Sequence, residues 1–254
     1  MEFSREYFFC IFLLFLCCGN DYMPIDPGIS HRMSINYADQ NNQPQQAVAL
    51  YSVPENYTPV NAYPLIIALH GYGSNAAAFH DLWRRVANRN KCILLTPQGT
   101  EPLQNDFGFE WGENAAEYIK LCYAAILDKI HIDTKSIYVV GFSAGGRLSY
   151  QLGLNSPTVF QGLAALGAPF EKSLINRNIR NFKTIGAYDD FRVYIGTGEE
   201  DALVEQAVQA NEAIRQLGAK VHFEKYENIG HSIPEPKKDE LLKILDFLLD
   251  TAAD

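Results

Sequence analysis

The sequence predicts an α/β fold in which a mostly parallel central sheet carries helices on both faces. Two observations predict it. Short apolar, β-branched runs alternate along the chain with longer segments of helical spacing. The composition, with 47% apolar and 20% charged residues among 254, is typical of a globular chain that can bury a sizeable core.

The predicted elements follow from these two periodicities. A strand buried on both faces reads as a short unbroken apolar run, as at 65–69, whereas a helix places apolar residues three and four positions apart, as Phe79, Trp83 and Val86 do. We expect an edge strand at 47–53 and further strands at 65–69, 92–96, 137–141, 162–167, 192–196 and 221–226. We expect helices at 76–90, 113–130, 144–152, 203–217 and 238–249.

One domain is expected to span residues 47–254, because no boundary or internal repeat divides this part of the chain. The polar stretch 19–46, rich in Asn, Gln and Pro, is predicted to be a tether. Residues 169–190 lack clear periodicity. They are a candidate excursion over the carboxyl edge of the sheet, where ligands bind in such folds.

Residues 1–18 are predicted to be a signal peptide, because they contain an apolar run too short to span a bilayer comfortably. The end of the run resembles a lipoprotein cleavage site, with Cys17 or Cys18 as the lipidated residue and a membrane tether as the consequence. Glu2 and Glu6 depart from the usual positive n-region. The alternative is an uncleaved N-terminal anchor. We expect an exported protein: periplasmic, anchored to the outer membrane, or secreted.

The net charge and the sequence motifs indicate which partners and cofactors the protein does not bind. The net charge of −9, with no basic cluster, disfavours a nucleic-acid partner. No metal or other cofactor is implied, because the sequence has no H-E-x-x-H motif and no Cys/His cluster. Cys92 and Cys122 are expected to be buried thiols, and whether they pair is left open.

The segment 137–146 is the most informative in the chain. An apolar strand ends in G-x-S-x-G, formed by Gly141, Ser143 and Gly145, and small residues that begin a helix follow it. This context is typical of a nucleophile elbow, where a tight turn raises the serine hydroxyl above the sheet. The new helix places backbone N–H groups and a positive dipole end beside that hydroxyl. Ser143 is therefore the candidate nucleophile.

A serine nucleophile needs a base and an acid that orients the base, and in this arrangement both come later in the chain. Asp201 follows the predicted strand 192–196 at the right offset, with Glu200 as the rival acid. His231 lies on the loop before the last helix and is the candidate base. The histidines within or beside predicted elements, among them His80, are interpreted as packing or surface residues.

An oxyanion pocket is predicted where the strand 65–69 runs into His70-Gly71-Tyr72-Gly73. The expected donors are the N–H of Tyr72, with that of Gly71 as the alternative, and the N–H of Ala144 after the nucleophile. His70 is interpreted as a brace for this loop.

These segments together resemble the α/β-hydrolase superfamily, over nearly the whole chain after the tether. The matching pieces are His70-Gly71-Tyr72-Gly73, Gly141-Phe142-Ser143-Ala144-Gly145-Gly146, the segment 198–204 and Gly230-His231-Ser232. More narrowly, the chain resembles polyhydroxybutyrate depolymerase-like and feruloyl-esterase-like enzymes and the phospholipase/carboxylesterase proteins. The resemblance implies an α/β-hydrolase fold without a large lid domain, and a serine esterase that cleaves small-molecule carboxylic esters through an acyl-enzyme.

The substrate pocket is less specifically indicated. Gly71 and Trp111 are candidate substrate-binding residues, the latter from the aromatic loop 107–113, for which a packed loop that anchors the next helix is the alternative. A serine peptidase or an acyl-thioesterase could use the same triad. A non-catalytic binding module on a hydrolase scaffold is a further alternative, which activity on short esters would exclude.

Overall fold

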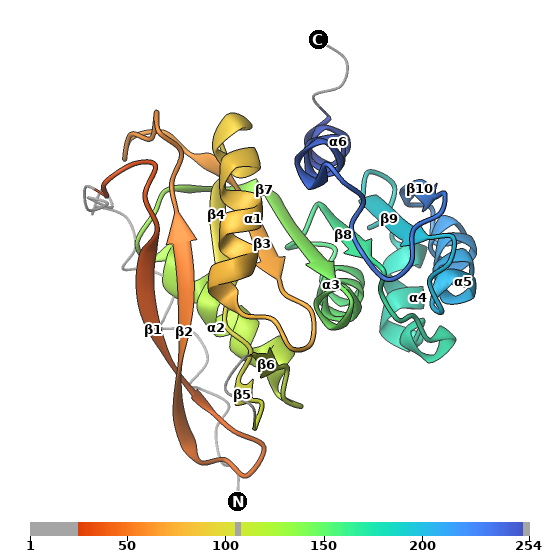
Figure 1. Ribbon diagram of the computed structural model, residues 1–254, viewed down its shortest axis with the longest axis horizontal. Coiled ribbons are helices and arrows are strands. Elements are labelled where there is room, and N and C mark those ends of the chain that lie inside the picture. The colour runs from red at the N-terminus through yellow and green to blue at the C-terminus, as the bar shows by residue number, and fades with distance from the viewer. Residues whose placement is uncertain (1–24, 105–107, 251–254) are drawn as a thin grey trace, which may run out of the picture.

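The computed structural model describes residues 25–104 and 108–250. An eight-stranded sheet, in the order β1-β2-β4-β3-β7-β8-β9-β10, runs through the molecule from the N-terminal elements on one side to β10 on the other (Figure 1). Strands β4, β3, β7, β8, β9 and β10 all run parallel to one another. Strand β2 pairs antiparallel with both β1 and β4. The predicted α/β architecture with a mostly parallel central sheet is confirmed.

The strands agree closely with the apolar runs of the sequence. The sheet comprises β1 (His31–Ala38), β2 (Pro44–Ser52), β3 (Tyr63–Leu69), β4 (Ile93–Pro97), β7 (Ile132–Phe142), β8 (Gly162–Leu166), β9 (Arg192–Gly198) and β10 (Lys220–Tyr226). A separate two-stranded ribbon consists of β5 (Glu101–Pro102) and β6 (Phe109–Glu110). The ribbon was not predicted, because strands of two residues carry no periodicity.

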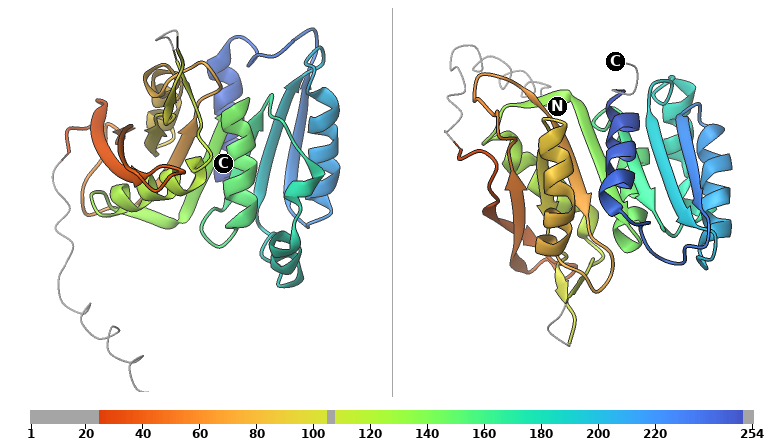
Figure 2. Two further views of the ribbon diagram at one scale, coloured as in Figure 1. Left: turned by 90° about the horizontal axis from the view of Figure 1, so that it is seen from below. Right: turned by 45° about the horizontal axis from the view of Figure 1, so that its top comes forward.

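Helices cover both faces of the sheet, as the two further views show (Figure 2). They are α1 (Ala76–Arg89), α2 (Ala115–Leu127), α3 (Ala144–Asn155), α4 (Arg177–Thr184), α5 (Val204–Arg215) and α6 (Lys237–Leu249). Helices α1 and α6 pack on one face, and α2, α3 and α5 pack on the other.

The two faces form two separate hydrophobic cores, and alternate residues of the central strands feed them. In β3, Leu65, Ile67 and Leu69 join the core under α2 and α3, whereas Ile66 and Ala68 join the core under α1 and α6. All five side chains are fully buried. A strand buried on both sides must be apolar at every position, which explains why these segments read as unbroken apolar runs.

The same division decides the state of the two described cysteines. Cys92 belongs to the core under α1 and α6, and Cys122 belongs to the core on the other face, so the sheet separates them. Both are free, and burial raises the pKa of each thiol to about 12. The disulfide that the sequence left open is absent from the described part of the chain.

The prediction of a tether was wrong over residues 31–46, which belong to the sheet and the turn between its first two strands. His31–Ala38 forms the edge strand β1, which pairs along its full length with β2, so β2 is not the edge strand that was expected at 47–53. Met33 and Ile35 are buried, while their neighbours Arg32, Ser34 and Asn36 are exposed. A strand at the rim of a sheet turns only alternate residues inward. Its composition is therefore polar enough to resemble a linker.

The excursion 169–190 contains the short 3-10 helix η1 (Lys172–Leu174) and helix α4. Asn176 caps α4, accepting a hydrogen bond from the Ile179 N–H at 3.1 Å. Ile179 is the one buried residue of this helix. Helix α4 is eight residues long, shorter than the window over which a helical period is recognised, and for this reason it was missed.

The predicted leader, with Cys17 and Cys18, lies outside the described residues. Among the helices that the structure describes, none combines the length and apolarity that crossing a membrane requires.

Candidate active site

Ser143 lies at the sharp turn between β7 and α3, with φ 54° and ψ −118°, in a region that non-glycine residues rarely adopt. The flanking glycines make this turn sterically feasible. A Cβ at Gly141 would lie 2.3 Å from the Gly145 carbonyl carbon, and a Cβ at Gly145 would lie 2.1 Å from the Leu69 oxygen. The Ser143 N–H donates to the Leu166 carbonyl at 2.8 Å, which ties the turn to β8. The geometry is that of a nucleophile elbow.

His231 lies between the serine and a carboxylate. Its Nε2 is 3.0 Å from Ser143 Oγ, and its Nδ1 is 2.7 Å from Asp201 Oδ2. Because a carboxylate only accepts, Nδ1 carries the proton, and Nε2 is then free to accept the serine proton. The structure thus brings together the three residues that the sequence singled out, although they lie 88 and 30 positions from one another in the chain.

The carboxylate that contacts His231 is that of Asp201, not that of its neighbour Glu200. The Asp201 side chain is 2% exposed, and its second oxygen accepts the Leu203 N–H at 2.9 Å. The Glu200 side chain is exposed, and its backbone N–H donates to the Ile229 carbonyl at 2.9 Å. That hydrogen bond joins the loop that carries the acid to the loop that carries the base.

Two neighbours of the triad were not singled out from the sequence. Gly167 has φ +48°, and a Cβ there would lie 3.2 Å from Asp201 Oδ2 and 3.3 Å from His231 Cε1. The Phe142 ring packs against the imidazole of His231, with 5.0 Å between ring centroids. The signal that could have found Gly167 is its place directly after a buried strand, at the carboxyl edge where the elbow also lies.

The loop after β3 approaches the serine closely. A Cβ at Gly71 would lie 3.4 Å from the Cβ of Ser143 and 3.2 Å from the Phe142 ring, so the backbone of this loop lies directly beside the nucleophile. Tyr72 follows, with its side chain 61% exposed. Ala144 is the first residue of α3, and the first N–H groups of a helix have no partner within it. The two predicted donors thus belong to segments that adjoin Ser143, the loop after β3 and the start of α3.

His70 braces this loop from inside. The Gly99 N–H donates to Nε2 at 2.9 Å, and Nδ1 donates to the Gly71 carbonyl at 2.8 Å. An amide must donate and a carbonyl must accept, so these two bonds define a neutral ring with its proton on Nδ1. Burial lowers the pKa of His70 below its ordinary value, in agreement with this state. The structural role predicted for His70 fits the geometry.

The Trp111 side chain does not have the position that its assignment to the substrate pocket predicted. The side chain is 5% exposed, its ring stacks on His70 with 4.7 Å between centroids, and its Nε1–H donates to the His70 carbonyl at 2.8 Å. The indole therefore supports the loop after β3 through its contacts with His70. A sequence shows that an aromatic residue is near a loop but not which side of the loop it packs on.

Within residues 25–104 and 108–250, no three His, Cys, Asp or Glu side chains converge as metal ligands would. Ser143, His231 and Asp201 form a hydrogen-bonded path, and the N-terminus of α3 lies beside it. Such an arrangement can deprotonate a hydroxyl and stabilise an oxyanion formed next to it.

A family model described as phospholipase/carboxylesterase matches residues 110–251. The chain belongs to the phospholipase/carboxylesterase family. The matched segment of this family member contains Ser143, Asp201 and His231, and it begins after the oxyanion loop.

Curated relatives match over part of this family member. It is 31% identical over 123 residues to poly(3-hydroxyalkanoate) depolymerase C of Paucimonas lemoignei, covering 44% of this chain and 30% of that one. It is 26% identical over 157 residues to carboxylesterase 20 of Arabidopsis thaliana, covering 58% and 46% of the two chains. The chain thus spans less than half of the length of either relative.

Solved structures share the fold over most of both chains. The fluorophosphonate-binding serine hydrolase F of Staphylococcus aureus superposes with a TM-score of 0.66 at 16% identity, covering 86% of this family member and 98% of that chain. Esterase PE8 superposes with a TM-score of 0.60 at 19% identity, covering 77% and 95%. At these identities the likeness establishes the fold alone.

Proposed function

We propose that the protein is a serine hydrolase that cleaves carboxylic esters through an acyl-enzyme intermediate. The observation that carries the proposal is the continuous hydrogen-bonded path from Ser143 Oγ through the His231 ring to Asp201. Membership of the phospholipase/carboxylesterase family supports the choice of ester bonds. The names of the depolymerase and carboxylesterase relatives support it as well.

The first half of the reaction forms the acyl-enzyme. Ser143 Oγ attacks the acyl carbon while His231 Nε2 takes the hydroxyl proton, and the carbonyl π electrons move onto the oxygen. Collapse of this tetrahedral intermediate breaks the bond to the alcohol, which leaves with the proton held by His231. Asp201 stays ionised, keeps the imidazole in the tautomer that accepts at Nε2, and stabilises the imidazolium while it exists.

Water completes the cycle by the same steps. It attacks the acyl-enzyme as His231 takes one of its protons, and the second collapse releases the carboxylic acid and returns the proton to Ser143 Oγ. In both tetrahedral intermediates the negative oxygen is placed to accept from the N–H groups of Tyr72 and Ala144. Backbone donors of this kind stabilise the oxyanion without any rearrangement at the moment of reaction.

The open surroundings of the serine favour short or exposed acyl groups. The excursion 169–190 has only η1 and α4 as regular structure, and Tyr72, at the lip of the oxyanion loop, is exposed. A thioester or a peptide bond could react by the same steps. The relative rates of hydrolysis of the three kinds of bond therefore decide which one is the substrate.

The experiment that tests the function uses short p-nitrophenyl esters, matched thioesters and peptide anilides, with the wild type and Ser143→Ala. We expect hydrolysis of the esters to be fastest, and its rate to fall by about 10³-fold or more in the variant. A fluorophosphonate probe should label the tryptic peptide that contains Ser143 in the wild type only. Equal activity in both proteins, or labelling elsewhere, would contradict the assignment.

We also propose that the chain is exported, on the basis of residues 1–18, with lipidation of Cys17 or Cys18 as the route to a membrane tether. Mass spectrometry of the mature N-terminus from the native host tests this. A lipidated cysteine or a trimmed N-terminus supports export, and an intact Met1 in the cytoplasmic fraction contradicts it.

A further inference from the structure

The first turn of α6 carries a buried carboxylate that faces the sheet. Glu240 is 6% exposed, and its Oε1 accepts hydrogen bonds from the Tyr194 hydroxyl at 2.6 Å and from the Tyr226 hydroxyl at 2.5 Å. Its Oε2 lies 3.4 Å from Lys243 Nζ. A buried charge is costly unless it is paired and hydrogen-bonded, and both oxygens of this carboxylate have partners. The carboxylate is therefore fixed between β9, β10 and α6.

Both tyrosines are placed to donate to this carboxylate. Burial raises the pKa of the Tyr194 and Tyr226 hydroxyls above their ordinary value, so each keeps its proton. The Tyr226 hydroxyl lies against the backbone of β9, where a Cβ at Gly196 would clash with it. Glycine at this position of β9 thus leaves room for the hydroxyl to reach Glu240.

The hydrogen bond between Tyr226 and Glu240 closes the loop that carries the candidate base. Tyr226 is the last residue of β10, Glu240 lies in the first turn of α6, and His231 lies between them. The bond therefore joins the two ends of this loop, 14 positions apart in the chain. Tyr194 differs in this respect, because it lies inside β9 and belongs to neither end of the loop.

The middle of the loop has few other contacts. The His231 side chain is 44% exposed, and a Cβ at Gly230 would have no described atom within 4 Å. The Glu200 N–H donates to the Ile229 carbonyl at 2.9 Å, and Ile233 is buried in the core under α1 and α6. A loop held at so few points depends on how firmly its ends are joined.

The start of α6 is fastened through Glu240. Within the first turn of this helix, residues 237–239 are exposed and Glu240 is buried. The apolar residues that pack α6 on the sheet begin one residue later, at Leu241. The bond from Tyr226 to Glu240 therefore sets where the second end of the loop lies relative to β10.

We propose that Glu240 and Tyr226 are positioning residues, whose hydrogen bond holds the loop between β10 and α6 so that His231 stays within reach of Ser143. The inference rests on the proposed function, because the position of the imidazole matters for proton transfer at Ser143 Oγ. His231 Nε2 lies 3.0 Å from that oxygen. A displacement of about 1 Å can lower a rate about 10²-fold. A loop with loosened ends spends less time in the productive position, and the rate falls accordingly.

The test compares Tyr226→Phe with Tyr194→Phe, which each remove one hydroxyl from the same carboxylate oxygen. Only the first variant separates the ends of the loop. In Tyr226→Phe we expect kcat on p-nitrophenyl acetate to fall about tenfold while KM stays within about twofold of the wild type. Tyr194→Phe should retain kcat within about twofold. Urea unfolding should show a similar loss of stability in both variants, each of them folded at the assay temperature.

Hydrogen exchange followed by mass spectrometry reports on the loop without any substrate. The amides of residues 227–236 should exchange about tenfold faster in Tyr226→Phe than in the wild type, and at the wild-type rate in Tyr194→Phe. Faster exchange with an unchanged kcat overturns the proposal, and so does an equal kcat in the two variants.

Glu240→Gln provides a second variant, which carries the test if Tyr226→Phe does not fold. Its amide oxygen still accepts from the tyrosines, but a neutral acceptor is weaker than a carboxylate. We expect kcat to fall about threefold with KM unchanged, and the exchange of residues 227–236 to rise. Wild-type values of both in Glu240→Gln overturn the proposal.

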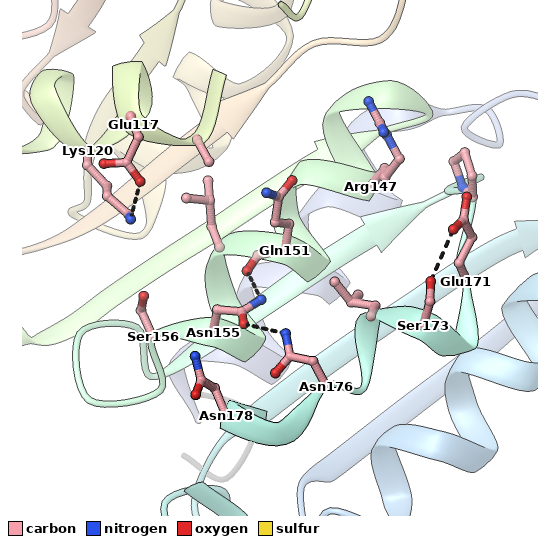
Figure 3. Close-up of a pocket in the computed structure, with 14 residues that line it drawn as sticks. Glu117, Lys120, Arg147, Gln151, Asn155, Ser156, Glu171, Ser173, Asn176 and Asn178 are labelled. Carbon is pink, nitrogen blue, oxygen red and sulfur yellow. Dashed lines mark hydrogen bonds and ion pairs between the residues drawn. The ribbon is translucent and has the colours of Figure 1, made fainter. Parts of the chain in front are cut away.

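A further control lies on the opposite face of the sheet. In a groove of about 560 Å³ beside α3, the Asn155 side chain accepts from Asn176 at 3.2 Å and joins α3 to the segment that begins α4 (Figure 3). Asn155→Ala removes this hydrogen bond between two segments but leaves the loop of His231 closed. It should retain the wild-type kcat and the wild-type exchange of residues 227–236.

The positioning role and the proposed function fail in different ways. If the wild type cleaves no ester and Ser143 takes up no fluorophosphonate, the proposed function fails, whatever the exchange rates are. If the wild type cleaves esters and Tyr226→Phe matches Tyr194→Phe in kcat, the positioning role fails while the hydrolase stands.

Discussion

At the scale of single residues, the site depends on two residues whose backbone has a positive φ. Ser143 adopts a positive φ, and Gly167 adopts another within contact distance of the acid and the base. Glycine adopts a positive φ without strain, but at Ser143 this conformation costs about 1–3 kcal/mol and persists only where the surrounding structure holds it. Ser143 is held by its hydrogen bond to Leu166 and by the close approach of Gly145 to β3.

The first prediction concerns Gly167→Ala. The new Cβ would meet Asp201 Oδ2 and His231 Cε1 at 3.2 and 3.3 Å, at a φ that alanine disfavours. We expect a stability loss of about 1–2 kcal/mol and a fall in kcat of about 10–100-fold, because the imidazole must shift relative to Ser143. Urea unfolding and ester kinetics on the same preparation measure both effects.

Its control is Gly218→Ala, also at a positive φ but with no atom closer than Asp189 Oδ1 at 3.5 Å. This variant should lose stability and retain kcat. If both variants keep full activity, Gly167 does not position the triad.

At the scale of elements, the carboxyl ends of four parallel strands supply the parts of the site. The loop after β3 carries Gly71 and Tyr72, the turn after β7 carries Ser143, and the loops after β9 and β10 carry Asp201 and His231. These ends meet at one edge because parallel strands in one sheet all point the same way. The order of strands in the sheet therefore decides which loops become neighbours.

The second prediction concerns the brace behind the oxyanion loop. Trp111→Phe keeps an aromatic ring for the stack on His70 but removes the N–H that donates to the His70 carbonyl. We expect kcat for ester hydrolysis to fall about tenfold with little change in KM, because the loop donor acts mainly on the transition state. Steady-state kinetics at constant temperature measure this split.

Trp83→Phe provides the comparison. The Trp83 Nε1 is buried and has no partner among the described residues, so this variant removes an indole N–H without breaking a hydrogen bond. It should retain kcat. An unchanged kcat in Trp111→Phe, together with a lower melting temperature, would restrict Trp111 to a structural role.

At the scale of the whole molecule, two buried histidines make stability depend on pH. His80 is 1% exposed and contacts Thr96 Oγ1 at 3.0 Å, and burial lowers its pKa to about 4. Burial also lowers the pKa of His70. Each ring is neutral in the folded protein and takes up a proton more readily once unfolded. The stabilisation from the neutral form is present above the unfolded pKa of about 6.5 and is lost as pH falls below it.

The third prediction follows for His80→Gln. Between pH 7.5 and pH 5, the wild type should lose about 2 kcal/mol more unfolding free energy than the variant, since only the wild type carries the depressed pKa of His80. Because His70 is present in both proteins, its contribution cancels. Urea titrations at the two pH values provide the numbers, and parallel losses in both proteins would refute this role for His80.

Much of the fold and of the candidate site could be predicted from patterns in the sequence. Each of these patterns can be seen without the tertiary structure. The apolar runs of β3 and β7 and the glycines around Ser143 lie within single segments, and the order of nucleophile, acid and base is an order along the chain. Each miss has its own physical reason. β1 is half exposed and resembles a linker, and α4 is too short, at eight residues, for its period to be recognised.

By itself, the sequence determined the α/β class, the elbow and the residue types that a proton relay needs, because periodicity and turn chemistry depend on neighbouring residues. Only the tertiary structure decided between Asp201 and Glu200, turned Trp111 toward His70, and brought Gly167 against the triad. These outcomes depend on how distant segments pack, and packing is a property of the assembled sheet and helices that no single segment contains.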